Sequence, residues 1–319
     1  MEHHHQHSEF TALLGKLNQA SERKQMSVTS DHPWGEAKDS DLWLRAEDKL
    51  SIYGTPYWDL ATDREKKQLS RLELASWWQG FIHFERLLSE YYMGLVNQDV
   101  FSDYPEVTEY LHHFCKEEIV HSMVFNKAMN HFGVETFNPP ENFKNVYTSK
   151  FDGGKLPLTD IYLTFIVEWI ADLQQRIDVQ GANVSPLAAT IVREHGREES
   201  RHIVFAKELI KTFGKDDSVF LEHARQFTPI FCRQFIDSGI GNAEAYERIG
   251  FENQAFQDID ALFDAIITND NRKKINSKIM RHVMPALVDA DIYCEQYHDL
   301  WVQCGFEDDV QRIRNRKKK

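Results

Sequence analysis

The chain has 319 residues, a net charge of −13 at neutral pH and a pI near 5.6. This acidic balance argues against a nucleic-acid-binding surface, and 42 % hydrophobic residues with 21 Phe, 11 Tyr and 7 Trp exclude global disorder. Only 15 glycines and 9 prolines occur, where an average chain of this length would carry about 22 and 16. Turns are therefore scarce, which favours long helices over a many-stranded β fold.

The cysteine pattern and the hydropathy of the chain indicate the cellular compartment. The four cysteines form no CxxC pair, which suits a reducing compartment. The start of the chain lacks the apolar segment of a signal peptide, and no apolar run approaches the roughly 18 residues of a membrane span. We expect a cytoplasmic protein with no membrane or nucleic-acid partner.

The predicted elements divide the chain into three parts. Residues 1–60 contain many polar residues with Pro, Gly and Trp and are predicted to form an irregular N-terminal arm. Residues 61–303 carry helical periodicity and are predicted to form a single domain. Residues 304–319 end in a run of Arg and Lys and are predicted to be a solvated basic tail.

Four long helices are predicted within the domain from their capping residues and apolar periodicity. Thr62 and Glu65 form a capping box, Gly133 ends the second helix, and Ser185 caps the fourth. The helices are expected at about 62–97, 105–132, 159–181 and 186–214, and weaker helical patterns follow at about 217–237, 243–268 and 272–303. The long connection is the loop 137–157, which predicts an all-α, ferritin-like four-helix bundle with one crossover and additional C-terminal helices.

Carboxylates and histidines recur on all four predicted helices at spacings that place them on shared faces. Glu118 and His121 lie about 60° apart on one helix, and the set at 195, 199 and 202 falls in one stripe. A Glu-x-x-His pair from each of two helices and a Glu from each of the others is the inward-facing set of a dinuclear metal bundle. The candidate metal ligands are Glu85, Glu118, His121, Glu168, His195, Glu199 and His202.

Charge supports a metal site. Glu168 lies within an apolar run, where an unpaired buried carboxylate would cost several kcal/mol. Four glutamates are formally neutralised by two divalent cations. Oxygen and nitrogen ligands with open positions suit iron or manganese better than a closed zinc site.

Each signal alone has a simpler explanation. A Glu118-x-x-His121 pair occurs by chance on exposed helices, and Glu168 alone could be a protonated core acid. Their occurrence in chain order on four capped helices favours the metal site.

Neighbouring residues suggest further roles. Asp172 could orient a ligating histidine through its free N–H, and Glu117 and Glu198 are equally consistent with such a role and with solvation. Arg281 and His282 could bind a substrate carboxylate, although a solvent-facing basic helix turn is the favoured explanation of them.

The metal-ligand pattern resembles the p-aminobenzoate N-oxygenase family of arylamine oxygenases over about residues 63–210. The interval of 32 residues between Glu85 and Glu118 matches, and so does the extra histidine at His195. Typical ferritin-like di-iron proteins have six protein ligands, so His195 distinguishes this family. The family usually has Asp where this chain has Glu117.

The resemblance implies two iron ions, with O₂ as co-substrate and electrons from a reductase, ferredoxin or small reductant. It implies N-oxygenation of a small amine, to the hydroxylamine, nitroso or nitro level, through a peroxo-diferric intermediate. Glu118 and Glu199 would bridge the irons, with Glu85 and His121 on one and Glu168, His195 and His202 on the other. Helical bundles of this size commonly form homodimers.

Alternative functions remain open at this stage. A di-iron C–H hydroxylase or desaturase acting on a carrier-bound or small organic substrate is the main enzymatic alternative. An iron-storage or peroxide-scavenging bundle is a third interpretation. Phe125 stands where a radical-storing ribonucleotide reductase subunit would have tyrosine, which argues against that function.

Overall fold

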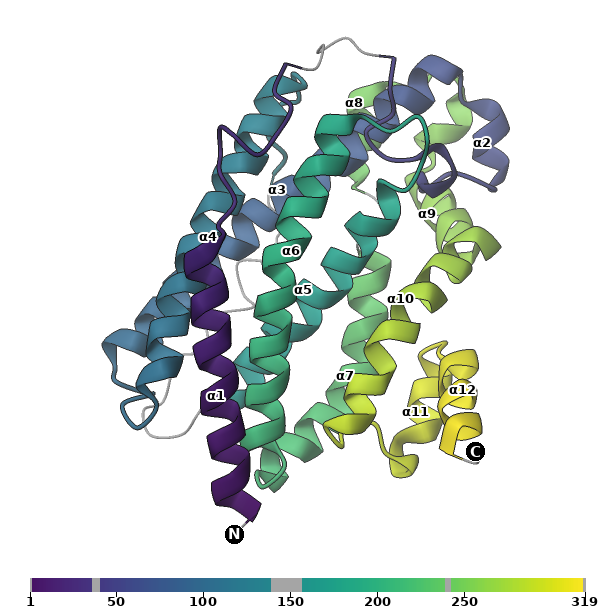
Figure 1. Cartoon of the computed structure of the whole chain (residues 1–319). Coiled ribbons are helices and arrows are strands. Elements are labelled where there is room, and N and C mark those ends of the chain that lie inside the picture. The colour runs from purple at the N-terminus through teal and green to yellow at the C-terminus, as the bar shows by residue number, and fades with distance from the viewer. Residues whose placement is uncertain (1, 36–40, 139–156, 239–241, 318–319) are drawn as a thin grey trace.

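The computed structural model describes residues 2–35, 41–138, 157–238 and 242–317 of the chain. Its centre is a bundle in which α3 packs along α4 and α5 packs along α6, with α4 also meeting α6 (Figure 1). These helices are α3 (Asp63–Asn97), α4 (Pro105–His131), α5 (Leu158–Asp178) and α6 (Pro186–Leu209). Their bounds agree with the predicted helices, and the fold is all-α and ferritin-like. The predicted loop at 137–157 falls mostly on residues 139–156, outside the described residues.

Capping residues set the ends of the bundle helices. The Thr62 side chain accepts a hydrogen bond from the Glu65 backbone amide, and the Glu65 carboxylate accepts one from the Thr62 amide. Ser185 accepts a hydrogen bond from the Ala188 amide at the start of α6. Gly133, just after α4, has a φ of +66°, which favours glycine. The predicted capping box and the other two signals are confirmed.

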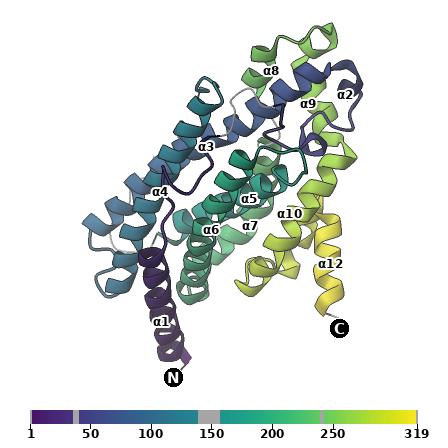
Figure 2. The ribbon, with the colours of Figure 1, turned by 45° about the horizontal axis from the view of Figure 1, so that its top comes forward.

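The prediction of an irregular arm is wrong for the first third of residues 1–60. Residues Glu2–Arg23 form helix α1, which packs against α4 and α6 (Figures 1 and 2). Phe10, Leu14 and Leu17 are buried at helical spacing, and this short apolar stripe holds α1 on the bundle. After α1, the described residues up to 62 contain only η1 (Glu47–Lys49) and α2 (Pro56–Leu60).

Among the C-terminal helices, α7 (Ser218–Ser238) and α10 (Asp270–Asp289) pack on α5, whereas α8 (Ala243–Ile249) packs on α3. The weak pattern at 243–268 is interrupted at Gly250, whose φ is +61°, and the pattern at 272–303 is interrupted near Asp291. Two further helices are α9 (Ile259–Thr268) and α11 (His298–Gln303). The shorter helical segments are the π-helical η3 (Ile210–Gly214) after α6, η4 (Gln254–Gln257) and η5 (Glu295–Tyr297).

The predicted solvated tail at 304–319 is also wrong. Residues Glu307–Lys317 form helix α12, which packs on α10 and α11. Val310 and Ile313 are buried in the main core, and acidic residues occupy the first turn, where they favour the helix dipole. In the sequence, the many basic residues of this segment obscured the amphipathic pattern of the helix.

The described helices contain none that combines the length and the apolar character needed to cross a membrane.

A buried ion-pair network joins the bundle to the segment before α3. The Arg45 guanidinium lies 2.6 Å from the Glu73 carboxylate on α3 and 3.1 Å from that of Asp178 on α5. Ser51 and Tyr246 also contact Glu73. Burial raises the pKa of Glu73 and of Asp178 despite the neighbouring Arg45. The network therefore ties segments that are distant in sequence to one end of the bundle.

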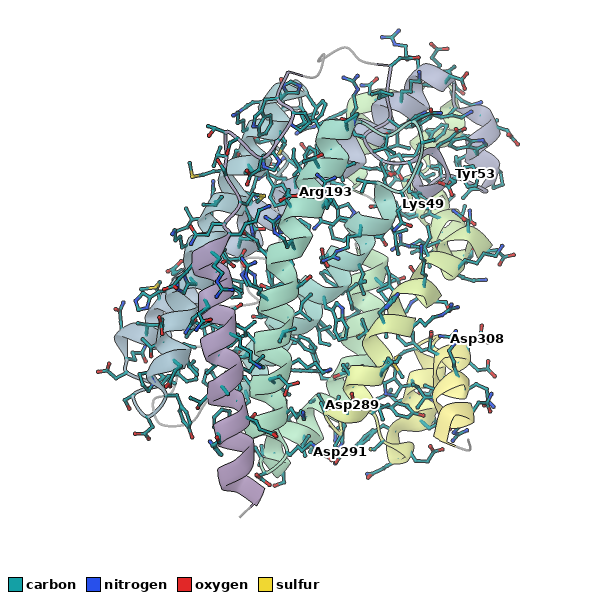
Figure 3. All side chains as sticks on the ribbon, in the orientation of Figure 1. Lys49, Tyr53, Arg193, Asp289, Asp291 and Asp308 are labelled. Atoms are coloured by element: carbon teal, nitrogen blue, oxygen red, sulfur yellow. The ribbon has the colours of Figure 1, made fainter. Side chains whose placement is uncertain are left out.

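Replacing Arg45 by Met should destabilise the fold by about 3–5 kcal/mol, because Glu73 and Asp178 would lose their buried cation. Urea denaturation measures this change. The control is Lys49→Met, four residues along the chain and labelled in Figure 3, where loss of the ion pair with the exposed Asp48 should cost under about 1 kcal/mol. Equal stability of the two variants would contradict the assigned role of Arg45.

Candidate metal centre

The structure brings all seven predicted metal ligands together in the interior of the bundle. Each is at most 3 % exposed. Their ligand atoms form two groups, and within each group these atoms lie within 4.8 Å of one another. The first group is Glu85, His121, His195 and Glu199, and the second is Glu118, Glu168, Glu199 and His202. Glu199 belongs to both groups, so the two candidate metal positions adjoin.

Glu118 and Glu199 each have one carboxylate oxygen near His121 and the other near His202. Glu199 Oε1 lies 3.3 Å from His121 Nδ1, whereas its Oε2 lies 3.5 Å from His202 Nδ1. Glu118 Oε2 lies 3.5 Å from His121 Nδ1, whereas its Oε1 lies 2.8 Å from His202 Nδ1. This geometry is compatible with the expected bridging role of Glu118 and Glu199.

The expected partition of the histidines needs one correction. His195 was expected beside Glu168 and His202, but its Nε2 lies 3.3 Å from Glu85 and 3.0 Å from Glu199. His195 therefore belongs to the first group. The reason is helical geometry: His195 and Glu199 are one turn apart on α6, and this turn faces Glu85 on α3.

Several atoms that face the cluster make no hydrogen bond of normal geometry among the described residues, although some of them lie 2.8–3.5 Å from one another. They are both carboxylate oxygens of Glu118, Oε1 of Glu168, Oε2 of Glu199, and Nδ1 of His121 and His202. Buried polar atoms are seldom left in this state. These atoms are of the types that bind divalent iron or manganese, and two divalent cations would balance the four carboxylates. The donor set therefore fits a dinuclear centre.

The two histidines of the Glu-x-x-His pairs are held by reciprocal contacts between α4 and α6. His121 Nε2 on α4 lies 2.9 Å from Glu198 on α6, and His202 Nε2 on α6 lies 2.9 Å from Glu117 on α4. Both carboxylates are buried. A histidine that donates Nε2–H to a carboxylate keeps Nδ1 free for a metal. Glu117 and Glu198 therefore orient the histidines and are not solvated.

These contacts favour the ionised carboxylates. Burial raises the pKa of Glu117, but the hydrogen bond from His202 and the charges of His202 and Arg201 outweigh it and lower the pKa to about 2. Burial also raises the pKa of Glu198, but the hydrogen bond and charge of His121 outweigh burial, so the pKa of Glu198 is lowered.

His195 is oriented by Gln175, and the prediction that Asp172 would orient a histidine is not supported by a direct contact. The His195 Nδ1 atom lies 2.6 Å from the Gln175 amide on α5. Asp172 instead accepts a hydrogen bond from Arg176 at 2.8 Å. Asp172 and Gln175 are three residues apart on α5, and of the two it is Gln175 whose hydrogen bond reaches the imidazole. Burial raises the pKa of Asp172 to about 6.

Aromatic rings enclose the histidines. The rings of Phe81 and Phe125 lie 5.0 Å and 4.9 Å from that of His195, and Phe114 lies 4.1 Å from His202. These three phenylalanines are buried. The cluster therefore has apolar walls, which strengthen the electrostatic interactions within it.

Arg281 and His282 do not reach the cluster. Both are exposed on α10. The buried face of that helix carries Ile279, Val283 and Leu287, and residues 281 and 282 lie on its other side. The predicted substrate contact is therefore not supported, and the solvent-facing interpretation is the one that agrees with the structure.

Sequence reasoning missed Gln175, Ser122 and Arg201. Ser122 donates a hydrogen bond to Glu85 at 3.1 Å, and Arg201 contacts Glu117 at 2.6 Å. One signal was present: a Glu-Glu-x-x-His sequence occurs at 117–121 and again at 198–202. The repeat could have marked both leading glutamates as partners of the histidines.

The stability of the metal-free protein should fall between pH 6.5 and 9. Burial lowers the pKa of His195, but the nearby carboxylates, Glu199 first, raise it to about 9. Its protonation therefore stabilises the fold below pH 6.5, and this contribution is lost as the pH rises through 9. Burial raises the pKa of Glu85 to about 7, which acts in the same direction at lower pH.

Melting temperatures at pH 6.5 and 9, with and without Mn²⁺, measure this effect. Metal ions replace the protons of the cluster, so the metal-loaded protein should lose less stability than the metal-free protein. An equal loss in both forms would contradict the electrostatic account.

Three curated relatives resemble the chain. They are the uncharacterized proteins Mb0909 of Mycobacterium bovis and MT0908 and Rv0885 of Mycobacterium tuberculosis, each 27 % identical over 220 residues. The match covers 64 % of this chain and 61 % of each relative, so it spans less than two thirds of their length.

A family model extends over most of the chain. The model of the P-aminobenzoate N-oxygenase AurF matches residues 7–291, which include most of α1, the four bundle helices and α10. All seven clustered residues fall within this match. The chain therefore belongs to the P-aminobenzoate N-oxygenase AurF family, a family of di-iron oxygenases.

Proposed function

We propose that this protein is a di-iron oxygenase that uses O₂ to N-oxygenate a small amine. The observation that carries the proposal is the pair of buried ligand groups that share Glu199. The family match supports oxygenase chemistry, and the extra imidazole of His195 is the feature that the resemblance associates with N-oxygenation.

The chain's own residues would hold two iron ions in unlike surroundings. Glu85, His121 and His195 would bind the first ion, and Glu168 and His202 the second, with Glu118 and Glu199 shared. When bound and reduced, the iron would supply the activation of O₂. Glu117, Glu198 and Gln175 would keep the imidazoles in the orientation that each metal position requires.

His195 gives the first position a second neutral ligand without adding negative charge. Phe81 and Phe125, which also stack on each other, both pack against the ring of His195 and give it apolar surroundings. Since a neutral imidazole donates electron density, we infer that it favours oxygen transfer to an amine over cleavage of the O–O bond within the site.

The reaction needs an electron donor. Conversion of an amine to a hydroxylamine places one oxygen atom of O₂ on nitrogen and reduces the other to water, which takes two electrons and two protons. A reductase, a ferredoxin or a small reductant would provide the electrons. Further rounds would give the nitroso or nitro level.

Metal binding provides the first test. Glu199→Gln should reduce the iron content at both positions, because one oxygen of Glu199 lies in each ligand group. Iron per chain is measured by elemental analysis after anaerobic loading. The matched control is Glu208→Gln on the same helix, where Glu208 pairs only with Lys211 among the described contacts. Wild-type iron content in Glu199→Gln would contradict the proposed centre.

Product analysis tests the reaction. Reduced, iron-loaded protein is mixed with ¹⁸O₂ and a panel of aryl amines, amino acids and carrier-tethered amines, and the products are identified by mass spectrometry. We expect labelled oxygen on nitrogen. Labelled oxygen on carbon would favour a C–H hydroxylase, loss of two hydrogens a desaturase, and iron oxidation with no organic product a storage or scavenging bundle. Any of these three results would overturn N-oxygenation.

A further inference from the structure

We propose that Arg201 is a positioning residue that couples the two metal positions, and that helix α1 holds it in place. This inference rests on the metal centre of the proposed function, and it assigns a role to residues outside the ligand set. Its basis is the contact network behind His121 and His202, on the side of these imidazoles that faces away from the cluster.

One guanidinium group reaches both histidine-orienting carboxylates. Arg201 Nη2 lies 2.6 Å from Glu117 and 3.2 Å from Glu198. Glu117 accepts from His202 at 2.9 Å, and Glu198 accepts from His121 at 2.9 Å. Arg201 is therefore linked to an imidazole of each ligand group through a single intervening carboxylate.

Charge explains why a cation is needed at this point. Glu117 and Glu198 are at most 1 % exposed and approach the same guanidinium, so without it two carboxylates would lie close together in the interior. Like charges at this depth repel strongly and would turn one carboxylate away. The histidine attached to that carboxylate would then lose the contact that fixes its ring.

Helix α1 and the residues after it complete the network. The Arg201 Nε–H donates to Ser21 Oγ near the end of α1 at 3.1 Å, and the Met26 amide donates to Glu198 Oε1 at 2.7 Å. Ser21 is fully buried and Met26 is 3 % exposed. Figures 1 and 2 show α1 lying alongside α4 and α6, the helices that carry the two Glu-Glu-x-x-His sequences. The N-terminal segment is thus a structural part of the metal centre.

The planar shape of arginine matters here. Its Nη2 faces the two carboxylates while its Nε faces Ser21, so one rigid group makes all three contacts. A lysine ammonium could approach the carboxylates but would have no second nitrogen for Ser21. We therefore expect Lys to restore part of the function of Arg201.

The test is the affinity for Co²⁺, a spectroscopic stand-in for ferrous iron, in four full-length variants. They are Arg201→Gln, Arg201→Lys, Ser21→Ala and the control Arg193→Gln. Arg193 lies on the same helix, is labelled in Figure 3, and has a side chain that is 66 % exposed. Co²⁺ per chain, its dissociation constants in competition with a chelator, its visible absorption bands and the melting temperature are measured for each.

Arg201→Gln should weaken Co²⁺ binding at both positions by about 10- to 100-fold, the range typical of residues that support metal ligands. Arg201→Lys should recover part of this loss, Ser21→Ala should show a smaller loss, and Arg193→Gln should match the wild type. If Arg201→Gln fails to fold, the Lys and Ala variants carry the same comparison.

Two results would overturn the inference while leaving the proposed function intact. The first is wild-type Co²⁺ affinity in the Arg201 variants, even with a lower melting temperature, which would make Arg201 a fold-stabilising residue only. The second is weakening at one position alone, which would contradict the coupling. Failure of the wild-type protein itself to bind Co²⁺ would instead overturn the proposed function, and the inference with it.

Discussion

Four glutamates buried at the centre of an apolar helical bundle are the constraint on which this structure depends. Glu85, Glu118, Glu168 and Glu199 lie within reach of three histidines and are almost wholly removed from water. Such a concentration of carboxylates is unfavourable unless cations or protons compensate it. In the metal-free protein the compensation comes from raised pKa values of the histidines and of Glu85 and Glu168. Two divalent metal ions would replace these protons.

The surrounding structure serves to keep this cluster ordered. Each histidine is fixed by a partner on a different helix, so the metal positions are defined by the packing of α4, α5 and α6 and not by any one of them. The Arg45 network performs a separate task at one end of the bundle, where it joins the segment before α3 to α3 and α5. The ligands are thus placed on rigid elements, as a reactive metal centre requires.

Much of the fold and of the candidate site could be predicted from the sequence because both depend on local patterns. Capping residues such as Thr62 and Ser185 mark helix ends, and helical spacing places His195, Glu199 and His202 on one face. The contacts of Gln175 and Arg201 could not be predicted, because they depend on how separate helices approach one another. Helices α1 and α12 were missed since each has only a short apolar stripe in a polar segment. The assignment of His195 to one of the two ligand groups could not be predicted either, because it depends on how α6 packs against α3.

The most direct measurement of the central claim is anomalous X-ray scattering at the iron edge from crystals of the iron-loaded protein. The account predicts two adjacent iron peaks inside the bundle, with a carboxylate oxygen of Glu199 on each and His195 on the iron that Glu85 binds. A single peak, peaks at the surface, or no peak beside these seven side chains would contradict it.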